Sequence, residues 1–86
     1  MIVAYDVGIE RVNKVKAFLR MHLTWIQNSL FEGEVSESRK LKVMQGVKEL
    51  ANQDKDAVVF YLFPNKKALE RSIIGIEKGS PDEVVL

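Results

Sequence analysis

The sequence predicts an α+β sandwich in which two helices pack on a four-stranded sheet, in the chain order βαββαβ. Apolar, strand-like runs alternate with two amphipathic segments in the order strand, helix, strand, strand, helix, strand. This order is the split βαβ arrangement of ferredoxin-like domains. The chain has 86 residues, which is enough for one small core, and no internal repeat divides it. We therefore expect a single domain over residues 1–86.

The first strand is expected at residues 2–5, where β-branched and aromatic side chains follow one another. Asp6 and Gly8 interrupt this apolar run and predict a turn. From residue 9 or 10 to about residue 23, apolar side chains recur at spacings of three and four, which predicts a helix. Arg20 lies near the end of this segment, where a cation suits the helix dipole.

The stretch after the first helix is strand-like, and a tight turn at Asn28–Ser29 divides it into strands at about 24–27 and 30–35. Without that turn, the chain would instead form a small parallel βαβαβ sheet, which is the alternative fold. Ser36 is a suitable N-cap for a second helix that continues to about residue 52. The apolar face of this helix is expected to comprise Leu41, Met44, Val47, Leu50 and Ala51.

The strongest strand signal is at residues 57–63, an unbroken apolar run that Pro64 ends. After a charged loop, residues 72–76 predict a further strand. Residues 79–86 begin with a Gly-Ser-Pro turn and close as a short apolar strand.

Strands 2–5 and 57–63 do not alternate between apolar and polar residues, so both of their faces are apolar. Two helices cover only one face of a ferredoxin-like sheet. We therefore expect a homodimer in which a second copy of the chain covers the other face. The alternative is a face of Ala and Tyr side chains that stays partly exposed.

The composition excludes several classes of protein and site. No apolar stretch approaches the roughly 20 residues of a membrane span, and the N-terminal run is too short for a signal-peptide core. The absence of cysteine excludes disulfides and thiolate metal sites. There is one histidine, His22, and no Gly-rich phosphate loop. We expect a cytoplasmic protein that does not bind membranes, and we interpret His22 as a packing residue at a helix end.

Asp6 is the first candidate for chemistry. A carboxylate directly after a buried strand sits on a rigid element, which is a common position for a metal-binding or catalytic acid. An Asp at a strand end is also a common turn former or helix cap. One carboxylate alone is a poor magnesium site, because magnesium prefers about six oxygen ligands.

Basic residues suggest a second kind of site. They gather on the first helix, at the start of the second helix and in the loop after Pro64. With a net charge of only +1, a nucleic-acid binder of this size must concentrate its cations on one surface. Each group is either an ordinary solvated face or part of a surface that follows phosphates. The candidate nucleic-acid-binding residues are Arg11, Lys14, Lys16, Lys66 and Lys67.

Two sequence motifs are more specific than these patterns. The strand V-A-Y-D at residues 3–6 precedes the first helix, and W-I-Q-N-S-L-F-E-G-E-V follows that helix at residues 25–35. With the second helix and the apolar strand after it, this order resembles the CRISPR-associated protein 2 family over essentially the whole chain. The resemblance implies a ferredoxin-like fold.

The resemblance also implies roles for individual residues. Asp6 matches the acidic residue that, in many members, binds magnesium or another divalent ion at the dimer axis, where two copies supply a pair of carboxylates. Tyr5, Ser29 and Phe31 match further family positions. Residues 83–86 match the segment that adds to the partner's sheet.

The chain departs from the nuclease-active members at positions where they carry arginines. Here these positions look to be held by Val12, Lys14 and Trp25. Lys14 keeps the charge but not the bidentate fork of arginine, and Trp25 keeps neither. The departures argue against vigorous nuclease activity.

The resemblance implies two functions of different classes. The first is an endonuclease on RNA or DNA, in which Mg²⁺ or Mn²⁺ held by the Asp6 pair activates water. The second is a structural adaptor in CRISPR adaptation, or spacer acquisition, whose dimer holds double-stranded DNA between two dimers of the CRISPR integrase subunit. We favour the adaptor as the biological role, with cleavage of DNA or single-stranded RNA as an additional activity. A ribonuclease-type toxin on the same fold is the further alternative.

Overall fold

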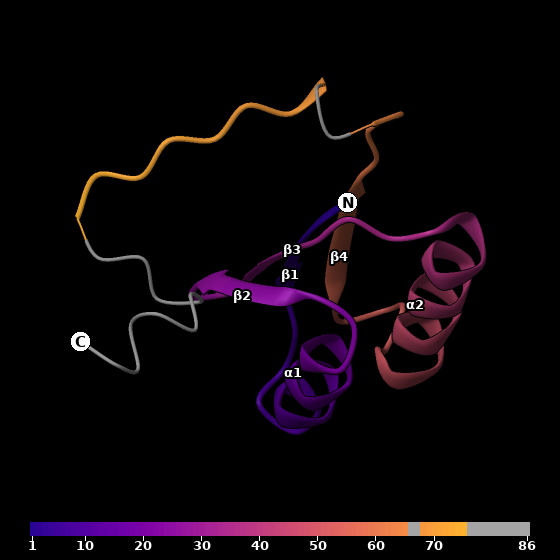
Figure 1. The fold of residues 1–86 in the computed structure, drawn as a ribbon. Coiled ribbons are helices and arrows are strands. Elements are labelled where there is room, and N and C mark those ends of the chain that lie inside the picture. Colours follow the sequence, from indigo (N-terminus) through magenta and orange to yellow (C-terminus); the bar gives the residue numbers. More distant parts are fainter. Residues whose placement is uncertain (66–67, 76–86) are drawn as a thin grey trace.

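The computed structural model describes residues 1–65 and 68–75 (Figure 1). Within these residues the chain forms a four-stranded sheet and two helices. The elements are β1 (Ile2–Asp6), α1 (Val12–Arg20), β2 (Thr24–Gln27), β3 (Leu30–Glu32), α2 (Glu37–Leu50) and β4 (Ala57–Tyr61). No helix in this part of the chain is long and apolar enough to cross a membrane.

The sheet has the strand order β2-β3-β1-β4, and every neighbouring pair is antiparallel. This topology confirms the βαββαβ prediction and rules out the parallel alternative. The expected turn between β2 and β3 is present, and Asn28 adopts a φ of 38° there, in the left-handed region that Asn tolerates. The indole Nε1 of Trp25 donates to the Asn28 carbonyl oxygen at 2.9 Å, which holds the turn against β2.

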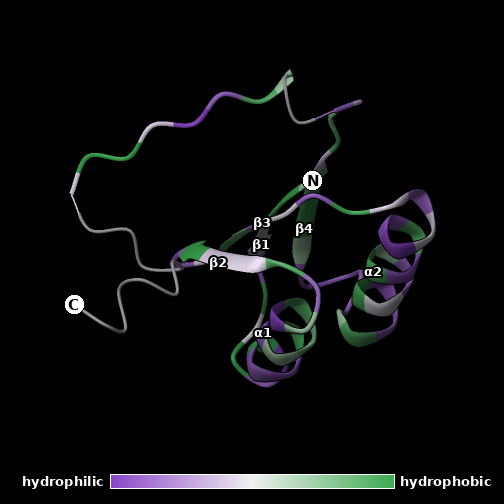
Figure 2. Ribbon diagram, viewed as in Figure 1, coloured by the Kyte–Doolittle hydropathy of each residue, from purple (hydrophilic) through white to green (hydrophobic). Residues whose placement is uncertain are grey.

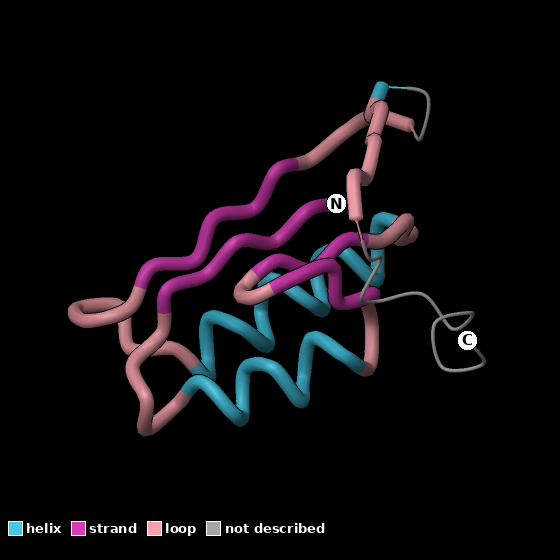
Figure 3. Tube along the Cα trace, turned by 90° about the vertical axis from the view of Figure 1, so that its left-hand side faces the viewer, coloured by secondary structure: helices cyan, strands magenta, loops and turns pink. Residues whose placement is uncertain are grey.

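Both helices lie on the same side of the sheet (Figure 3), and the core forms between the two layers. Alternation along β1 sends Val3 and Tyr5 toward the helices, and Phe31 of β3 pairs with Val3 and is fully buried. The buried core consists of Val3, Tyr5, Val15, Leu19, Leu23, Phe31, Val43 and Val47. It is apolar throughout, so burial of these side chains is the main force that joins helices to sheet.

Helix α1 begins at Val12, later than the expected residue 9 or 10. The backbone between β1 and α1 forms a turn in which the Gly8 carbonyl accepts from the Arg11 and Val12 amides, both at 2.9 Å. Residues 9–11, which the sequence pattern assigned to the start of the helix, belong to this turn instead. Arg20 lies in the last turn of the helix, as predicted.

Helix α2 begins as predicted, because the Ser36 hydroxyl accepts from the Arg39 amide at 3.2 Å and caps the helix. Its predicted apolar face is partly wrong. Val43 and Val47 are the buried residues, whereas Leu41 is 63% exposed. The helix is rotated because Gly46 lies directly against the ring of Phe18 on α1, a close approach that places Val43 over the sheet.

Two strands end earlier than the sequence predicts. Strand β3 ends at Glu32 instead of residue 35, and β4 ends at Tyr61 instead of residue 63. Both of these residues pair with Ile2, the first residue of β1. The strand pairing therefore stops where β1 begins. The residues after Glu32 and Tyr61 have no strand of the described sheet to pair with, although several of them are apolar.

The strand expected at 72–76 is not formed over residues 72–75, which have no regular secondary structure. The segment through residue 75 (Figure 1) pairs with none of the four described strands, so no strand ladder satisfies its backbone. Ile74 is fully exposed there. Residue 76 and the strand expected within 79–86 lie outside the described residues.

No helix or strand of the described part of the chain covers the sheet face opposite the helices, and this face is largely apolar. The register places Ile2, Ala4, Leu30, Val59 and Tyr61 together on this face. Figure 2 shows the apolar character along β1 and β4. Val59 is 46% and Tyr61 52% exposed in the single chain. The apolar character expected of both faces of these strands is thus confirmed.

Candidate functional site

Asp6 is the last residue of β1, and its side chain is exposed on the uncovered face of the sheet. It pairs with Ala57, the first residue of β4, so it belongs to the antiparallel ladder and not to a loose loop. The carboxylate is therefore positioned by two strands at the end of an apolar face. The structure thus places Asp6 at the end of a strand, as expected, and its role in metal binding or catalysis stays a prediction.

A second carboxylate, Asp56, lies directly before Ala57 and has a fully buried side chain. Its Oδ2 accepts from Arg11 Nε at 2.6 Å and from the Asn52 amide at 2.7 Å. Its Oδ1 accepts from Arg11 Nη2 and from the Gly8 amide, both at 2.8 Å. One carboxylate thus joins the β1–α1 turn to the segment between α2 and β4.

The hydrogen bond from Arg11 is the main reason why the pKa of Asp56 lies well below its usual range, and the Asn52 and Gly8 amides lower it further. Burial acts in the opposite direction and is outweighed. The same hydrogen bond raises the pKa of Arg11. The pair is therefore ionised at neutral pH, and it fixes the chain on both sides of the Asp6–Ala57 pair.

This arrangement changes the interpretation of Arg11. Its guanidinium forms a bidentate pair with Asp56 and also lies 3.9 Å from Glu10 Oε1. The side chain is 22% exposed, so most of it is not available to a ligand. A role in nucleic-acid binding stays a prediction for Arg11, whereas its structural role is visible directly. The sequence analysis missed Asp56, and the available signal was an acidic residue directly before the strongest strand.

The three further residues that resemble family positions lie around β1. Tyr5 is buried, and its ring stacks on that of Phe31 with centroids 6.1 Å apart. The Ser29 carbonyl accepts from the Tyr5 amide at 3.1 Å, which ties the β2–β3 turn to the end of β1. The Tyr5 hydroxyl is buried with no hydrogen-bond partner in the described part of the chain, and burial raises its pKa. These residues support the strand that carries Asp6.

A single chain does not supply a complete metal site at Asp6. Among residues 1–65 and 68–75, no three His, Cys, Asp or Glu side chains gather closely enough to hold an ion. Magnesium usually needs more than one carboxylate or a phosphate. Asp6 therefore fits a divalent ion only if a second copy of the chain or a nucleic-acid phosphate completes the ligand set.

The helices carry the positive charge of the molecule. Helices α1 and α2 contain seven basic and two acidic residues, a net charge of +5 in a chain whose total is +1. Lys14 is exposed and Lys16 half-buried on α1. The helix layer and the apolar sheet face lie on opposite sides of the sandwich, so the charge segregation that nucleic-acid binding requires is present. Lys66 and Lys67 lie outside the described residues.

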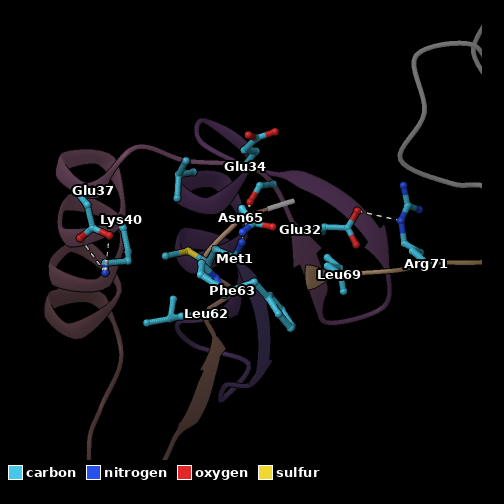
Figure 4. Close-up of a pocket in the computed structure, with 13 residues that line it drawn as sticks. Met1, Glu32, Glu34, Glu37, Lys40, Leu62, Phe63, Asn65, Leu69 and Arg71 are labelled. Atoms are coloured by element: carbon cyan, nitrogen blue, oxygen red, sulfur yellow. Dashed lines mark hydrogen bonds and ion pairs between the residues drawn. The ribbon is translucent and has the colours of Figure 1, made fainter. Parts of the chain in front are cut away.

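A cavity of about 520 Å³ lies at the other end of the sheet, near the N-terminus (Figure 4). Four of its charged side chains form two pairs, since Arg71 Nε lies 2.9 Å from Glu32 Oε1 and Lys40 Nζ lies 2.9 Å from Glu37 Oε2. The Met1 amino group donates to the Gly33 carbonyl at 2.9 Å. None of the predicted site residues in the described part of the chain lines this cavity. The candidate site is therefore the Asp6 end of the sheet.

The sequence model of the family described as "CRISPR associated protein Cas2" matches residues 1–71. The chain belongs to the Cas2 family. A Cas2 relative from Archaeoglobus fulgidus, named "CRISPR-associated endoribonuclease Cas2 2", is 52% identical over 100% of this chain and 94% of its own length. The "CRISPR-associated endoribonuclease Cas2" of Methanothermobacter thermautotrophicus is 43% identical over 100% of this chain and 93% of its own length.

The fold agrees with this family. A solved structure described as "Crystal structure of cas2" has a TM-score of 0.79 and 39% identity, and it covers 92% of this chain and 88% of its own. The Cas2 resemblance, based on the V-A-Y-D strand and the segment at 25–35, is thereby confirmed. The ferredoxin-like fold class is confirmed with it.

Proposed function

We propose that this protein acts as a homodimer in CRISPR adaptation, in the cytoplasm, where it holds double-stranded DNA between dimers of the CRISPR integrase subunit. We further propose that the Asp6 carboxylates of the two chains give the dimer a divalent-metal-dependent endonuclease activity on RNA or DNA. The observation that carries the proposal is the division of the Cas2 sandwich into an apolar, Asp6-bearing face and a basic helix layer.

The uncovered sheet face supports the dimer. This face carries an apolar surface beside Glu32, and no helix in the described part of the chain lies over it. Its apolar residues are Ile2, Ala4, Leu30, Val59 and Tyr61. A patch of this kind on a small domain marks an interaction site. A two-fold axis through the face would bring the same residues of two chains together, because such an interface is self-complementary. Residues 83–86 of each chain would add to the partner's sheet, as the family resemblance implies.

The helix layers would then point away from the dimer interface and remain free for DNA. The net charge of +5 on each layer attracts phosphates without reading base sequence. We therefore expect duplex binding that is independent of sequence and weakens steeply with salt. We expect two pairs of lysines to contact phosphates, Lys14 with Lys16 and Lys66 with Lys67.

The position of Asp6 supports the metal site. Each chain carries the carboxylate at the end of the apolar face, so a second copy is the simplest source of a second carboxylate. A bound Mg²⁺ or Mn²⁺ would polarise a phosphoryl oxygen and lower the pKa of a bound water. The Asp56–Arg11 pair keeps the strand ends in register beneath it. The names of the curated relatives, which are called endoribonucleases, agree with this activity.

Two variants separate the adaptor role from cleavage. Asp6→Asn should abolish metal-dependent cleavage of single-stranded RNA and DNA while leaving the dimer and duplex binding intact. Lys14→Glu with Lys16→Glu should weaken duplex binding by roughly 10-fold or more at moderate salt and lower the salt slope by about 2.

Cleavage, where present, should require Mg²⁺ or Mn²⁺ and rise toward alkaline pH, because metal binding displaces protons. Fluorescence anisotropy and gel-based cleavage assays measure the two properties.

Cleavage by Asp6→Asn at the parent's rate would show that the Asp6 carboxylate is not needed for the activity. Duplex binding that is insensitive to salt, or unchanged in the lysine variant, would contradict the adaptor surface. Co-purification with an integrase tests the partner independently. The named relatives are all Cas2 proteins of CRISPR systems, so the toxin alternative has no support from them.

A further inference from the structure

Three nitrogen-bearing side chains gather where the C-terminal end of α1 meets the first turns of α2. His22 follows α1, and its Nδ1 lies 2.9 Å from Nη1 of Arg39 on α2. Lys42, three residues further along α2, acts electrostatically on the same imidazole. The His22 ring is held in place by an edge contact with Phe18, with the ring centroids 4.9 Å apart. We name His22, Arg39 and Lys42 the interhelical cluster.

The hydrogen bond fixes the protonation state of His22 in the free protein. A guanidinium has only donors, so Arg39 donates and Nδ1 accepts, which requires a neutral ring with its proton on Nε2. Burial is the main cause that lowers the pKa of His22, and the charges of Arg39 and Lys42 lower it further. The charged groups that face the ring are these two cations of α2, and its contact on α1 is the apolar Phe18.

Within the described residues, the interhelical cluster has no counterion. Neither Arg39 nor Lys42 has an acidic partner among residues 1–65 and 68–75, and the nearby Glu37 is bound by Lys40. An arginine that rests on a neutral imidazole, with an unpaired lysine beside it, leaves a site of positive potential open to solvent. Such a site is complementary to an anion with several acceptor oxygens.

We propose that the interhelical cluster binds a phosphodiester group of duplex DNA and that His22 takes up a proton when it does so. Arg39 would turn from the imidazole to the phosphate, and the protonated Nδ1 of His22 would donate to the same group. Lys42 would supply the third cation. This inference deepens the proposed DNA-binding function and rests on it.

The surroundings favour a polyanion over free phosphate. The hydrogen bond of the cluster is exposed, so a single small anion would be held weakly. The cluster belongs to the helix layer, which also carries Lys14, Lys16 and Arg20 on α1. A duplex would contact several of these cations at once, and each contact would raise the local concentration of phosphate at the cluster.

The sign of the pH dependence follows from linkage. In the free protein the pKa of His22 is below its ordinary value near 6.5, and a bound phosphate raises it. Binding is then accompanied by proton uptake, so affinity is higher at acidic pH and falls as the pH rises. If phosphate raises the pKa by about one unit, the affinity for duplex changes by up to roughly 10-fold across the titration.

The experiment measures the affinity of the protein for a 30-base-pair DNA duplex by fluorescence anisotropy. The measurement is made at pH 5.5 and at pH 7.5, at constant ionic strength. The parent should lose roughly 3-fold to 10-fold in affinity on going to pH 7.5. His22→Gln should abolish this difference. Arg39→Gln should weaken binding at both pH values more than Lys48→Gln, a matched control that removes the same charge from α2 outside the cluster.

A second readout is the NMR titration of His22 itself. The chain contains one histidine, so an untagged sample gives a single imidazole signal. Its pKa should rise when the duplex is bound in the parent but not in Arg39→Gln. Inorganic phosphate, added at the same concentration of phosphate groups, should leave the pKa of His22 nearly unchanged. A circular dichroism spectrum and melting curve for each variant confirm that it is folded.

The outcomes distinguish the inference from the function on which it rests. A parent that binds duplex with no pH dependence, or a His22 pKa that is unchanged by duplex, overturns the inference alone. An equal rise with inorganic phosphate shows a free-phosphate site and also overturns it. A parent that fails to bind duplex even at low salt overturns both the inference and the proposed DNA-binding function.

Discussion

Asp56 shows how much one buried side chain organises in this fold. Its carboxylate receives hydrogen bonds from Gly8, Arg11 and Asn52, which lie in two segments of the chain. Arg11 and Asp56 are 45 positions apart in the sequence. Because β4 begins at the next residue, the contact also places the partner of Asp6 in the sheet. Asp56 is a positioning residue for the candidate site and touches none of the reacting groups.

The Asp56–Arg11 pair makes stability depend on pH in the acid range. The folded-state pKa of Asp56 lies below that of an unfolded aspartate, which titrates near pH 4. Its contribution is therefore complete above about pH 4 and is lost as the pH falls further toward the folded-state value. We expect Asp56→Asn to lower the melting temperature at pH 7 by roughly 10 °C, with a difference from the parent that narrows below pH 3.

Asp54→Asn is the matched control, because Asp54 is exposed in the same loop and uses only its backbone amide to bond Asn52. Differential scanning fluorimetry across pH 2–8 measures both variants. A constant gap between Asp56→Asn and the parent down to pH 2 would count against the ionised pair.

Single residues were predicted unevenly from the sequence. Asp6 was identified because a carboxylate at the end of an apolar run is a local pattern. Asp56 was not identified, because its importance comes from Arg11 and Gly8, which are distant in the chain, and a polar loop carries no sign of that contact. The same limit applies to Arg11, whose charge was visible and whose partner was not.

At the scale of elements, the contact between the helices determines how α2 is turned. Apolar residues are spread around this helix, so the sequence pattern alone allowed more than one buried face. Gly46 decides between them because only a residue without a side chain fits against the Phe18 ring. Val43 and Val47 are then buried, and Leu41 is left exposed. A glycine in the middle of a helix was the signal for this close approach.

Gly46→Ala should therefore destabilise the protein by about 1–3 kcal/mol, since a methyl group at this position would overlap the Phe18 ring. The effect opposes helix propensity, which favours alanine by about 1 kcal/mol. Urea unfolding followed by circular dichroism measures the change. Adding Phe18→Leu to Gly46→Ala should recover part of the loss. A more stable Gly46→Ala variant would show that the helices separate easily and that the contact does not fix α2.

The strands were predicted best where their residues lie in the centre of the sheet. β1 and β4 were located correctly because both are continuous apolar runs. Their ends were less well predicted, since Glu32 and Tyr61 end their strands at the point where β1 begins. Residues 72–75 have strand-like composition but no neighbouring strand in the described part of the chain. Hydrogen bonding to a neighbouring strand determines where a strand ends and whether a segment forms one. Composition does not encode this pairing.

At the scale of the whole molecule, the sandwich has two unlike surfaces. The sheet presents an apolar face that ends at Asp6, and the helices present a net charge of +5. The sequence predicted the first surface from the absence of alternation in two strands. It left the second undecided, because the total charge of +1 hides the excess of cations in the helices. The basic groups on the helices were visible in the sequence, and the structure adds that both helices lie on one side of the sheet.

The dimer makes a direct prediction for Val59, which lies on the uncovered face and pairs with Ala4. Val59→Lys should place a charge in the interface and raise the dimer dissociation constant on the order of 100-fold. Light scattering coupled to gel filtration at micromolar concentration should then detect monomer. Leu41→Lys, an exposed apolar residue on α2, is the control and should remain dimeric. A monomeric parent, or a Val59→Lys variant that stays dimeric, would contradict this interface.

The separation of the two surfaces has a consequence for how such a protein changes over generations. The residues that would hold two copies together project from one layer of the sandwich, and those that would grip DNA project from the other. The core between the layers contains no charged side chain in the described part of the chain. A substitution on a helix surface can therefore alter the hold on DNA without disturbing association, and a substitution on the open sheet can do the reverse. Mutation and selection can thus adjust the two properties separately, one layer at a time.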